Sequence, residues 1–312
     1  MQRIFLDHAS TTPVAPGVLT AMLPYLGERF GNPSGPHGRG AAAREAVERA
    51  RADVAALGGA AAEEIVFTGS ATEANNLALK GLVQAAGGRS LHLAAASTEH
   101  ISVLHPLRTL EKRGCRVSRL PVDGRGSIDP DDVARVIAPD TILISVAHAS
   151  GEIGTLQPLA EICRVARDRG VPVHCDATLT AGVIPWPSGD EGPDLVTVTP
   201  HLFYGPQGVG ALRVRRGLRL APLVEGGGQE GGLRAGTEPL AAIVGFGAAA
   251  RLAVEERAGR ALRSSARAAR LRLLLQERLA GAVFTGHPAH RIPGHLSLCV
   301  RGTEAEALLT AL

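Results

Sequence analysis

The chain contains almost no lysine. Of its 33 lysine and arginine residues, only Lys80 and Lys112 are lysines. A reaction that depends on a lysine amine therefore has two candidates at most. The formal net charge is only +3, and the arginines are spread along helical stretches such as residues 260–278. This pattern is typical of solvated helix faces rather than of a basic groove, so we expect no nucleic-acid partner.

Long apolar runs are also missing, although hydrophobic residues make up 45% of the chain. No run approaches the roughly 20 residues that a membrane-spanning helix needs. Asp7 and His8 interrupt the N-terminal stretch before a signal-peptide core could form. We therefore expect a cytoplasmic protein with no membrane segment.

Cysteine is scarce and unpaired in sequence. The four cysteines, Cys115, Cys163, Cys175 and Cys299, include no CxxC pair. This argues against a zinc site or a redox dithiol, and we expect no metal. Because the four lie in apolar strand-like or helical stretches, we expect buried, inert thiols.

What the sequence does contain is a regular alternation of short apolar runs and helical patterns. "EIVFTG" precedes the helix-like "ATEANNLALKGLVQAA", while "TILISVAH" and "VPVHCDA" flank the helix-like "LAEICRVARDRG". Asp129 and Pro130 match the capping pattern of a helix start. The alternation predicts an α/β fold with a mostly parallel sheet and helices on both faces. Ligands of such sheets bind beyond the carboxyl ends of the strands.

The pattern changes from about Gly236. An Ala/Arg/Leu-rich helical stretch extends to about Leu279, and "HLSLCVRG" and "TEAEALLTAL" then predict one strand and one helix. A strand and a helix cannot bury a core of their own. We therefore divide the chain into an N-terminal arm (1–13), a large α/β domain (14–240), connecting helices (241–280) and a truncated small domain (281–312).

Several predicted strands end in polar residues. The turn "TGSATE" (68–73) precedes a helix, so it is either an anion site or a plain N-cap. Asp176 follows an apolar strand, so its carboxylate pairs either with backbone groups or with a cationic ring nitrogen of a ligand. His100 ends "STEH" and is either a ligand contact or a core residue. "GGGQEGGLRAGT" (226–237) lacks the GK[ST] ending of a Walker loop. "GPQGVG" (205–210) precedes a strand, so it is not a dinucleotide fingerprint, and a mobile loop is the simpler interpretation of both stretches.

Taken together, these stretches resemble the cysteine desulfurases, pyridoxal 5′-phosphate (PLP) enzymes of the class V aminotransferase family, and most of all the group that supplies iron–sulfur cluster assembly. The resemblance runs in family order over nearly the whole chain. The matching stretches are "FLDHASTTPV", "FGNPSGPHGRG", "EIVFTGSATEANNLALKG", "STEH", "GEIGTLQPL", "HCDAT", "YGPQGVGAL" and "GGGQEGGLRAGT". It implies the PLP-dependent transferase fold type I.

The resemblance also implies roles for individual residues. His100 would stack on the pyridine ring, and Asp176 would keep the ring nitrogen protonated so that the cofactor acts as an electron sink. The phosphate would be held by Thr72, Thr199 and His201, and by Thr237 of a neighbouring subunit, since the family forms homodimers with shared sites. Arg234 would lie at the same interface or reach the substrate.

Leu202 is the sharpest departure from the family. A lysine follows the histidine of the family's HK pair, forms the Schiff base with PLP and moves the Cα proton. Leucine has no amine and can do neither. Lys80 lies eight residues beyond Thr72, about 12 Å along a helix, and Lys112 lies at a predicted helix end, so neither is a credible replacement.

Other departures surround the same site. The family's asparagine pair before "EIG" is here Ser150 and Gly151, its glutamine after "DAT" is Leu179, and Pro200 replaces a small residue. The family's cysteine-bearing loop and a carboxylate-binding arginine would both follow Leu312. None of the four cysteines matches the loop position.

These departures favour a desulfurase-like pseudoenzyme that is impaired or inactive in desulfuration on its own and binds PLP, if at all, noncovalently. Such a protein is a partner or scaffold, a cofactor binder or a decayed gene product, and its own expected partner is a sulfur acceptor or a scaffold protein. One alternative is an active PLP-dependent desulfurase, converting L-cysteine to L-alanine and persulfide sulfur, that another chain completes. A second is a phosphate-ligand binding module without chemistry.

Overall fold

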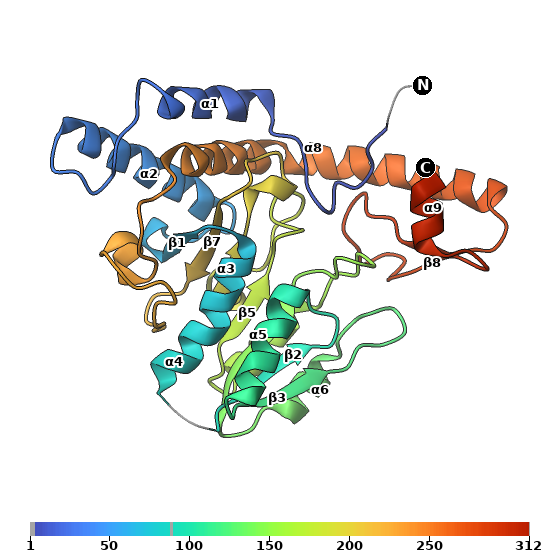
Figure 1. The fold of residues 1–312 in the computed structure, drawn as a ribbon. Helices are drawn as coiled ribbons and strands as arrows, with labels where there is room; N and C mark the ends of the chain where they lie inside the picture. The colour runs from blue at the N-terminus through green and yellow to red at the C-terminus, as the bar shows by residue number, and fades with distance from the viewer. Residues whose placement is uncertain (1–3, 88–89, 312) are drawn as a thin grey trace.

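The computed structural model describes residues 4–87 and 90–311, and a seven-stranded sheet forms its centre (Figure 1). The strands lie in the order β1-β7-β6-β5-β4-β2-β3. In chain order they are β1 (Ile65–Thr68), β2 (His92–Ala96), β3 (Arg116–Leu120), β4 (Thr141–Ala147), β5 (Val173–Asp176), β6 (Leu195–Val198) and β7 (Gly210–Val214).

The predicted α/β fold with a mostly parallel sheet is confirmed. The pairs β3–β2, β2–β4, β4–β5 and β5–β6 are parallel, and only β7 pairs antiparallel with its two neighbours, β6 and β1. β1 therefore runs in the same direction as the parallel strands. The carboxyl ends of β1, β2, β4, β5 and β6 meet at one edge of the sheet, together with the start of β7.

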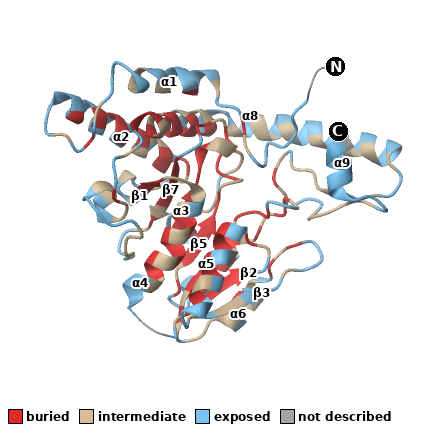
Figure 2. Ribbon diagram, in the orientation of Figure 1, coloured by how far each residue is buried: buried red, intermediate tan, exposed pale blue. Residues whose placement is uncertain are grey.

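Helices cover both faces of the sheet, as expected. One hydrophobic core joins the sheet to α2 (Gly38–Ala56), α6 (Pro130–Val136), α7 (Leu159–Arg167) and the first half of α8 (Leu240–Arg278). A second core joins the opposite face to α5 (Ile101–Lys112) and to the helical run at residues 71–86. Figure 2 shows the buried residues concentrated in the strands and on the helix sides that face them. α1 (Pro16–Leu26) packs on α8.

Local sequence explains where the helices near the sheet edge begin. The run at 71–86 consists of α3 (Ala71–Asn76), a π-helical turn, η2 (Leu77–Gly81), and α4 (Leu82–Ala86). Ser70 caps it, because its Oγ accepts a hydrogen bond from the backbone N–H of Glu73 at 3.1 Å. His100 caps α5 and Asp129 caps α6. The capping role predicted for Asp129 is confirmed.

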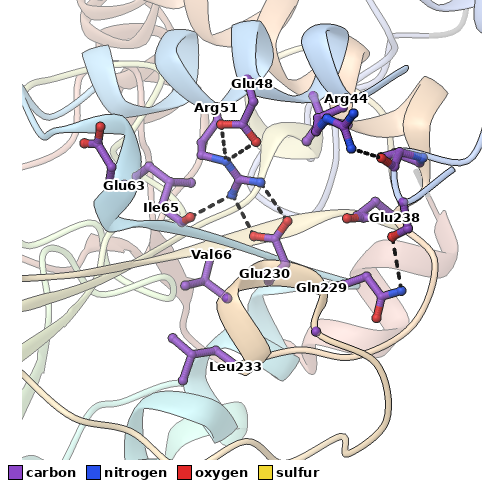
Figure 3. A pocket seen from close by; sticks show the side chains of 15 residues that line it. Arg44, Glu48, Arg51, Glu63, Ile65, Val66, Gln229, Glu230, Leu233 and Glu238 are labelled. Atoms are coloured by element: carbon purple, nitrogen blue, oxygen red, sulfur yellow. Dashed lines mark hydrogen bonds and ion pairs between the residues drawn. The ribbon is translucent and has the colours of Figure 1, made fainter. Parts of the chain in front are cut away.

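Side chains satisfy the open backbone groups of the edge strand β1. Glu230, in the glycine-rich loop, accepts a hydrogen bond from the backbone N–H of Phe67 at 2.7 Å. Arg51, on α2, donates to the carbonyl of Ile65 at 2.8 Å and to both carboxylate oxygens of Glu230 at 2.7 and 2.8 Å (Figure 3). An unpaired strand edge invites pairing with another chain, and this buried pair occupies it.

The C-terminal part differs in detail from the expectation. α8 is one helix of 39 residues that runs along one side of the molecule, and its buried residues lie between Leu240 and Ala253 (Figure 1). After it come β8 (Ala282–Phe284), β9 (Leu298–Val300) and α9 (Ala305–Ala311). The strand predicted in "HLSLCVRG" and the helix predicted in "TEAEALLTAL" are confirmed as β9 and α9. The sequence prediction missed β8, which pairs antiparallel with β9. The division into four parts stays a prediction.

The cysteine prediction is half correct. Cys163 and Cys175 are buried, and burial raises the pKa of Cys163 to about 12. Cys115 is only half-buried and Cys299 is exposed. Cys299 lies on β9, in the two-stranded sheet outside the main cores.

Within residues 4–87 and 90–311, no three His, Cys, Asp or Glu side chains are arranged to hold a metal ion. Over those same ranges, no helix is long and apolar enough to cross a bilayer.

Candidate active site

Asp176 and His100 are linked through two polar residues at the carboxyl edge of the sheet. Asp176 ends β5 and is 7% exposed. Its Oδ2 accepts a hydrogen bond from Nδ2 of Asn75 on α3 at 2.7 Å, and the same nitrogen donates to Ser102 Oγ at 2.9 Å. Ser102 Oγ lies 2.7 Å from Nδ1 of His100. The structure therefore connects the two residues that were predicted to contact a pyridine ring.

This network fixes the tautomer of His100. Its Nδ1 accepts a hydrogen bond from the backbone N–H of Ser102 at 3.2 Å, so Nδ1 carries no proton. Nε2 therefore carries the proton of the neutral ring. The side chain is anchored at one ring edge while the residue itself is exposed. A histidine held in this way can offer its flat face to an aromatic ligand.

Asp176 retains the capacity to pair with a ligand cation. Its Oδ1 accepts from the backbone N–H and the hydroxyl of Thr178, at 3.1 and 2.7 Å. A carboxylate offers roughly four acceptor sites, and three are used. The remaining one, on Oδ2, suits the protonated ring nitrogen of PLP, so the residues present fit this part of the cofactor.

The turn at residues 68–72 and Thr199 lie together at the same edge. A Cβ at Gly210 would stand 2.5 Å from the carbonyl carbon of Ser70, so the start of β7 packs directly on the turn. Thr199 follows β6 and donates to the carbonyl of Val209 at 2.9 Å. Thr72 is exposed in the first turn of α3, whereas Thr199 is only 2% exposed. Because the Thr199 hydroxyl proton is occupied, this side chain would have to rotate before it could donate to a phosphate.

His201 is half-buried on a short 3₁₀ turn, η4 (Pro200–Leu202). The N-terminal segment holds this turn in place, because both the backbone N–H and the hydroxyl of Thr12 donate to the His201 carbonyl at 2.8 Å. Thr11 Oγ1 lies 3.3 Å from His201 Nδ1. Sequence reasoning missed this support from Thr11 and Thr12, which lie about 190 residues away along the chain.

Thr237 and Arg234 lie in the glycine-rich loop and differ in their contacts. Thr237 is exposed, and its predicted role toward a neighbouring subunit stays a prediction. Arg234 forms an ion pair within the chain, with Glu73 at the start of α3. This pair brings the loop to the turn at residues 68–72.

Leu202 occupies the end of η4 and is half-buried. Gly151 and Leu179, at two of the positions expected to depart from the family pattern, lie close together: a Cβ added at Gly151 would stand 3.2 Å from Cδ1 of Leu179. Leu179 thus fills space into which an asparagine at position 151 would extend. The two replacements are therefore coupled by packing.

Neither lysine lies near the linked residues. Lys112 ends α5, whose N-cap is His100, so the length of a 12-residue helix separates them, about 18 Å. Lys80 lies in η2, eight residues or about 12 Å beyond Thr72. Both helices place their lysines away from the sheet edge at which the candidate residues gather.

Three buried titratable groups surround the network without joining it. Burial lowers the pKa of His148 and of His174 to about 4. His174 lies between the hydroxyls of Ser145 and Thr197, at 2.9 and 3.1 Å, and His148 lies 2.9 Å from the hydroxyl of Thr180. These two histidines are neutral structural residues. Glu99, next to His100 in sequence, is 5% exposed, and burial raises the pKa of its carboxyl to about 8.

Asn75, Ser102 and Glu99 were missed by sequence reasoning. A polar residue on an otherwise apolar helix face was the only available signal for Asn75, which is fully buried. Its Oδ1 and the Oε2 of Glu99 are buried without a hydrogen-bond partner. Buried polar atoms of this kind mark places where a ligand or water completes the site.

The comparisons with known proteins agree with this geometry. Residues 4–312 match the model of the aminotransferase class-V family. The chain is 45% identical over 312 residues to the cysteine desulfurase IscS of Anaeromyxobacter dehalogenans (strain 2CP-C), covering 99% of this chain and 77% of that protein. It is 40% identical over 311 residues to the cysteine desulfurase IscS of Dictyoglomus turgidum, covering 100% of this chain and 79% of the relative.

A solved structure supports the same assignment. A NifS-like protein superposes with a TM-score of 0.95 at 33% sequence identity, and the match covers 99% of this chain and 85% of that one. Class V aminotransferases and their cysteine desulfurase members depend on PLP. The chain therefore belongs to the class V aminotransferase family, among its cysteine desulfurase-like proteins.

Proposed function

We propose that this chain is a desulfurase-like protein that binds PLP without a covalent bond and does not carry out desulfuration by itself. Leu202 carries the proposal. It stands where the family's lysine would attach the cofactor and move a proton, and its side chain can do neither. The far positions of Lys80 and Lys112 support the view that no other amine takes over.

The remaining contacts suit noncovalent binding. Asp176 would pair with the ring nitrogen, and His100 would cover the ring while Ser102 holds its Nδ1. Thr72, His201 and a rotated Thr199 would bind the phosphate, with Thr237 of a second copy. PLP, when bound, supplies an electron sink for amino-acid chemistry. The side chains of Leu179 and Leu202 are apolar, so neither could move a proton at its own position.

Absorbance and mass mapping of the protein with PLP test the proposal. We expect PLP to be retained weakly and lost on desalting, with no visible band of a lysine adduct. After borohydride reduction, neither Lys80 nor Lys112 should carry the label. A stoichiometric adduct on either lysine, together with alanine release from cysteine, would instead establish an active desulfurase. Failure to bind PLP while inorganic phosphate still binds would favour the phosphate-ligand module.

We also propose a homodimer, because large apolar side chains are exposed along residues 4–30. Leu19, Leu23 and Leu26 are 47%, 55% and 67% exposed at helical spacing on α1. Ile4, Phe5, Leu6 and Phe30 are 57–78% exposed nearby in sequence. An exposed apolar patch of this kind marks an interaction surface.

Sedimentation velocity at micromolar concentration should show a dimer for the unaltered chain. Leu23→Glu places a charge in the apolar stripe and should shift the protein toward monomer, since burying an unpaired charge costs several kcal/mol. Leu309→Glu, at a 73% exposed position on α9, is the matched control and should remain dimeric. A monomeric parent chain would contradict the proposal.

A further inference from the structure

Arg234 neutralises a carboxylate that lies at the phosphate turn. Its Nε donates to Oε1 of Glu73 at 2.9 Å, while Oε2 of Glu73 accepts from the backbone N–H of Gly69 at 2.9 Å. Both side chains are about a quarter exposed, at 23% and 26%. Glu73 therefore brings a negative charge to the first turn of α3, next to Thr72. Without compensation, this charge would repel a phosphate ester at the same place.

The loop that carries Arg234 is anchored four residues earlier. The Glu230 side chain is 2% exposed and pairs with Arg51, whose side chain is 11% exposed. Glu230 also holds the backbone N–H of Phe67. Glu230 thus contacts Phe67, and Arg234 contacts Glu73, so the loop follows this stretch from one end to the other. Figure 3 shows the pair of Arg51 and Glu230, which anchors the loop that carries Arg234.

We propose that Arg234 is a positioning residue for phosphate recognition: it cancels the charge of Glu73 and keeps that carboxylate on Gly69, so that the turn accepts a phosphate monoester dianion. The proposal rests on the PLP site proposed above. It assigns Arg234 a role within its own chain, which differs from the interface or substrate role expected from the sequence.

Removing the two charges singly and together tests the proposal. The variants are Arg234→Met, Glu73→Gln and the double variant, and the ligands are PLP and pyridoxal, which lacks the phosphate. Dissociation constants are measured by fluorescence titration well below the unfolding temperature. Arg234→Met should weaken PLP about tenfold, an effect of about 1.4 kcal/mol. Glu73→Gln/Arg234→Met should restore PLP affinity to within about threefold of the parent, because the uncompensated charge is gone. Pyridoxal affinity should not change.

Arg213→Met is the matched control. Arg213 pairs with Glu64 at 3.2 Å, away from the turn, and this pair is more buried, with side chains 13% and 12% exposed. It should lower stability and leave PLP affinity unchanged. If Arg234→Met binds PLP like the parent, or if the double variant binds no better than Arg234→Met, the proposal is wrong.

Amide hydrogen exchange separates this proposal from the proposed function. If the parent chain binds no PLP, the proposed function fails, and exchange at the Gly69 N–H then decides the role of Arg234. Arg234→Met should accelerate exchange at Gly69, because Glu73 loses the partner that holds it there. Unchanged exchange at Gly69 in that variant would overturn the proposal.

Discussion

Replacing Leu202 with lysine is expected to convert a reversible PLP complex into one that borohydride traps at residue 202. Lysine extends two atoms further from η4 than leucine does, and the change adds an amine at the end of η4. The covalent bond to the lysine introduced at residue 202 adds binding free energy. A gain of about 1.4 kcal/mol already raises affinity tenfold, so retention of PLP through desalting should rise by at least about tenfold. A visible absorbance band and mass mapping of the reduced peptide measure the result.

The scarcity of lysine makes this experiment unusually clean. Lys80→Arg/Lys112→Arg removes both native lysines, so that in Leu202→Lys on this background residue 202 carries the only lysine side chain. Leu202→Met is the matched control, because it alters the side chain without adding an amine. If the lysine variant gives no adduct at residue 202 while PLP still binds, residue 202 does not stand where the family's lysine attaches the cofactor, and the proposal is wrong on this point.

The close approach of Leu179 to Gly151 affects any attempt to restore the family's asparagine at position 151. An asparagine at position 151 would meet Cδ1 of Leu179 at the 3.2 Å distance of its Cβ alone. Such overpacking costs about 1–3 kcal/mol. A side chain at position 151 requires Leu179 to shift, so Gly151→Asn is best made together with Leu179→Gln.

The alternation of apolar runs was enough to predict the sheet, because buried parallel strands and amphipathic helices have distinct periods. It was not enough for β8, a strand of three residues that is defined by its partner β9 rather than by a pattern of its own. The π-turn at residues 77–81 was equally invisible, because it changes the helix without changing its apolar face.

The same limit applied to the site. Asp176 and His100 stand at strand ends, where polarity after an apolar run is a local signal. The bond from Asn75 to Asp176 joins residues 101 positions apart, and the pair of Arg51 and Glu230 joins residues 179 apart. Nothing near either residue in sequence reveals such a partner. The resemblance supplied the roles of single residues, whereas the structure supplied what holds them.

Glu99→Gln is expected to change how the stability of the ligand-free protein depends on pH. Glu99 accepts one hydrogen bond, from the backbone N–H of Ala147 at 2.6 Å, and its Oε2 is buried without a partner. Burial raises the pKa of this carboxyl from 4.5 to about 8, and nearby Asp176 adds to the shift. The folded state therefore binds the proton more tightly than the unfolded state. The contribution of protonated Glu99 is fully present below about pH 4.5 and is lost as the pH rises toward 8.

Glutamine keeps the acceptor for Ala147 and cannot ionise, so the variant should gain stability relative to the parent across this window. The difference in unfolding free energy should be small near pH 4.5 and reach the order of a few kcal/mol in favour of Glu99→Gln above pH 8. Urea unfolding at a series of pH values measures it. His148 and His174 also titrate, but their low pKa values destabilise both proteins equally as the pH falls from 6.5 toward 4, so subtraction removes them. Parallel pH profiles for the two proteins would show that Glu99 does not hold a proton in the folded state.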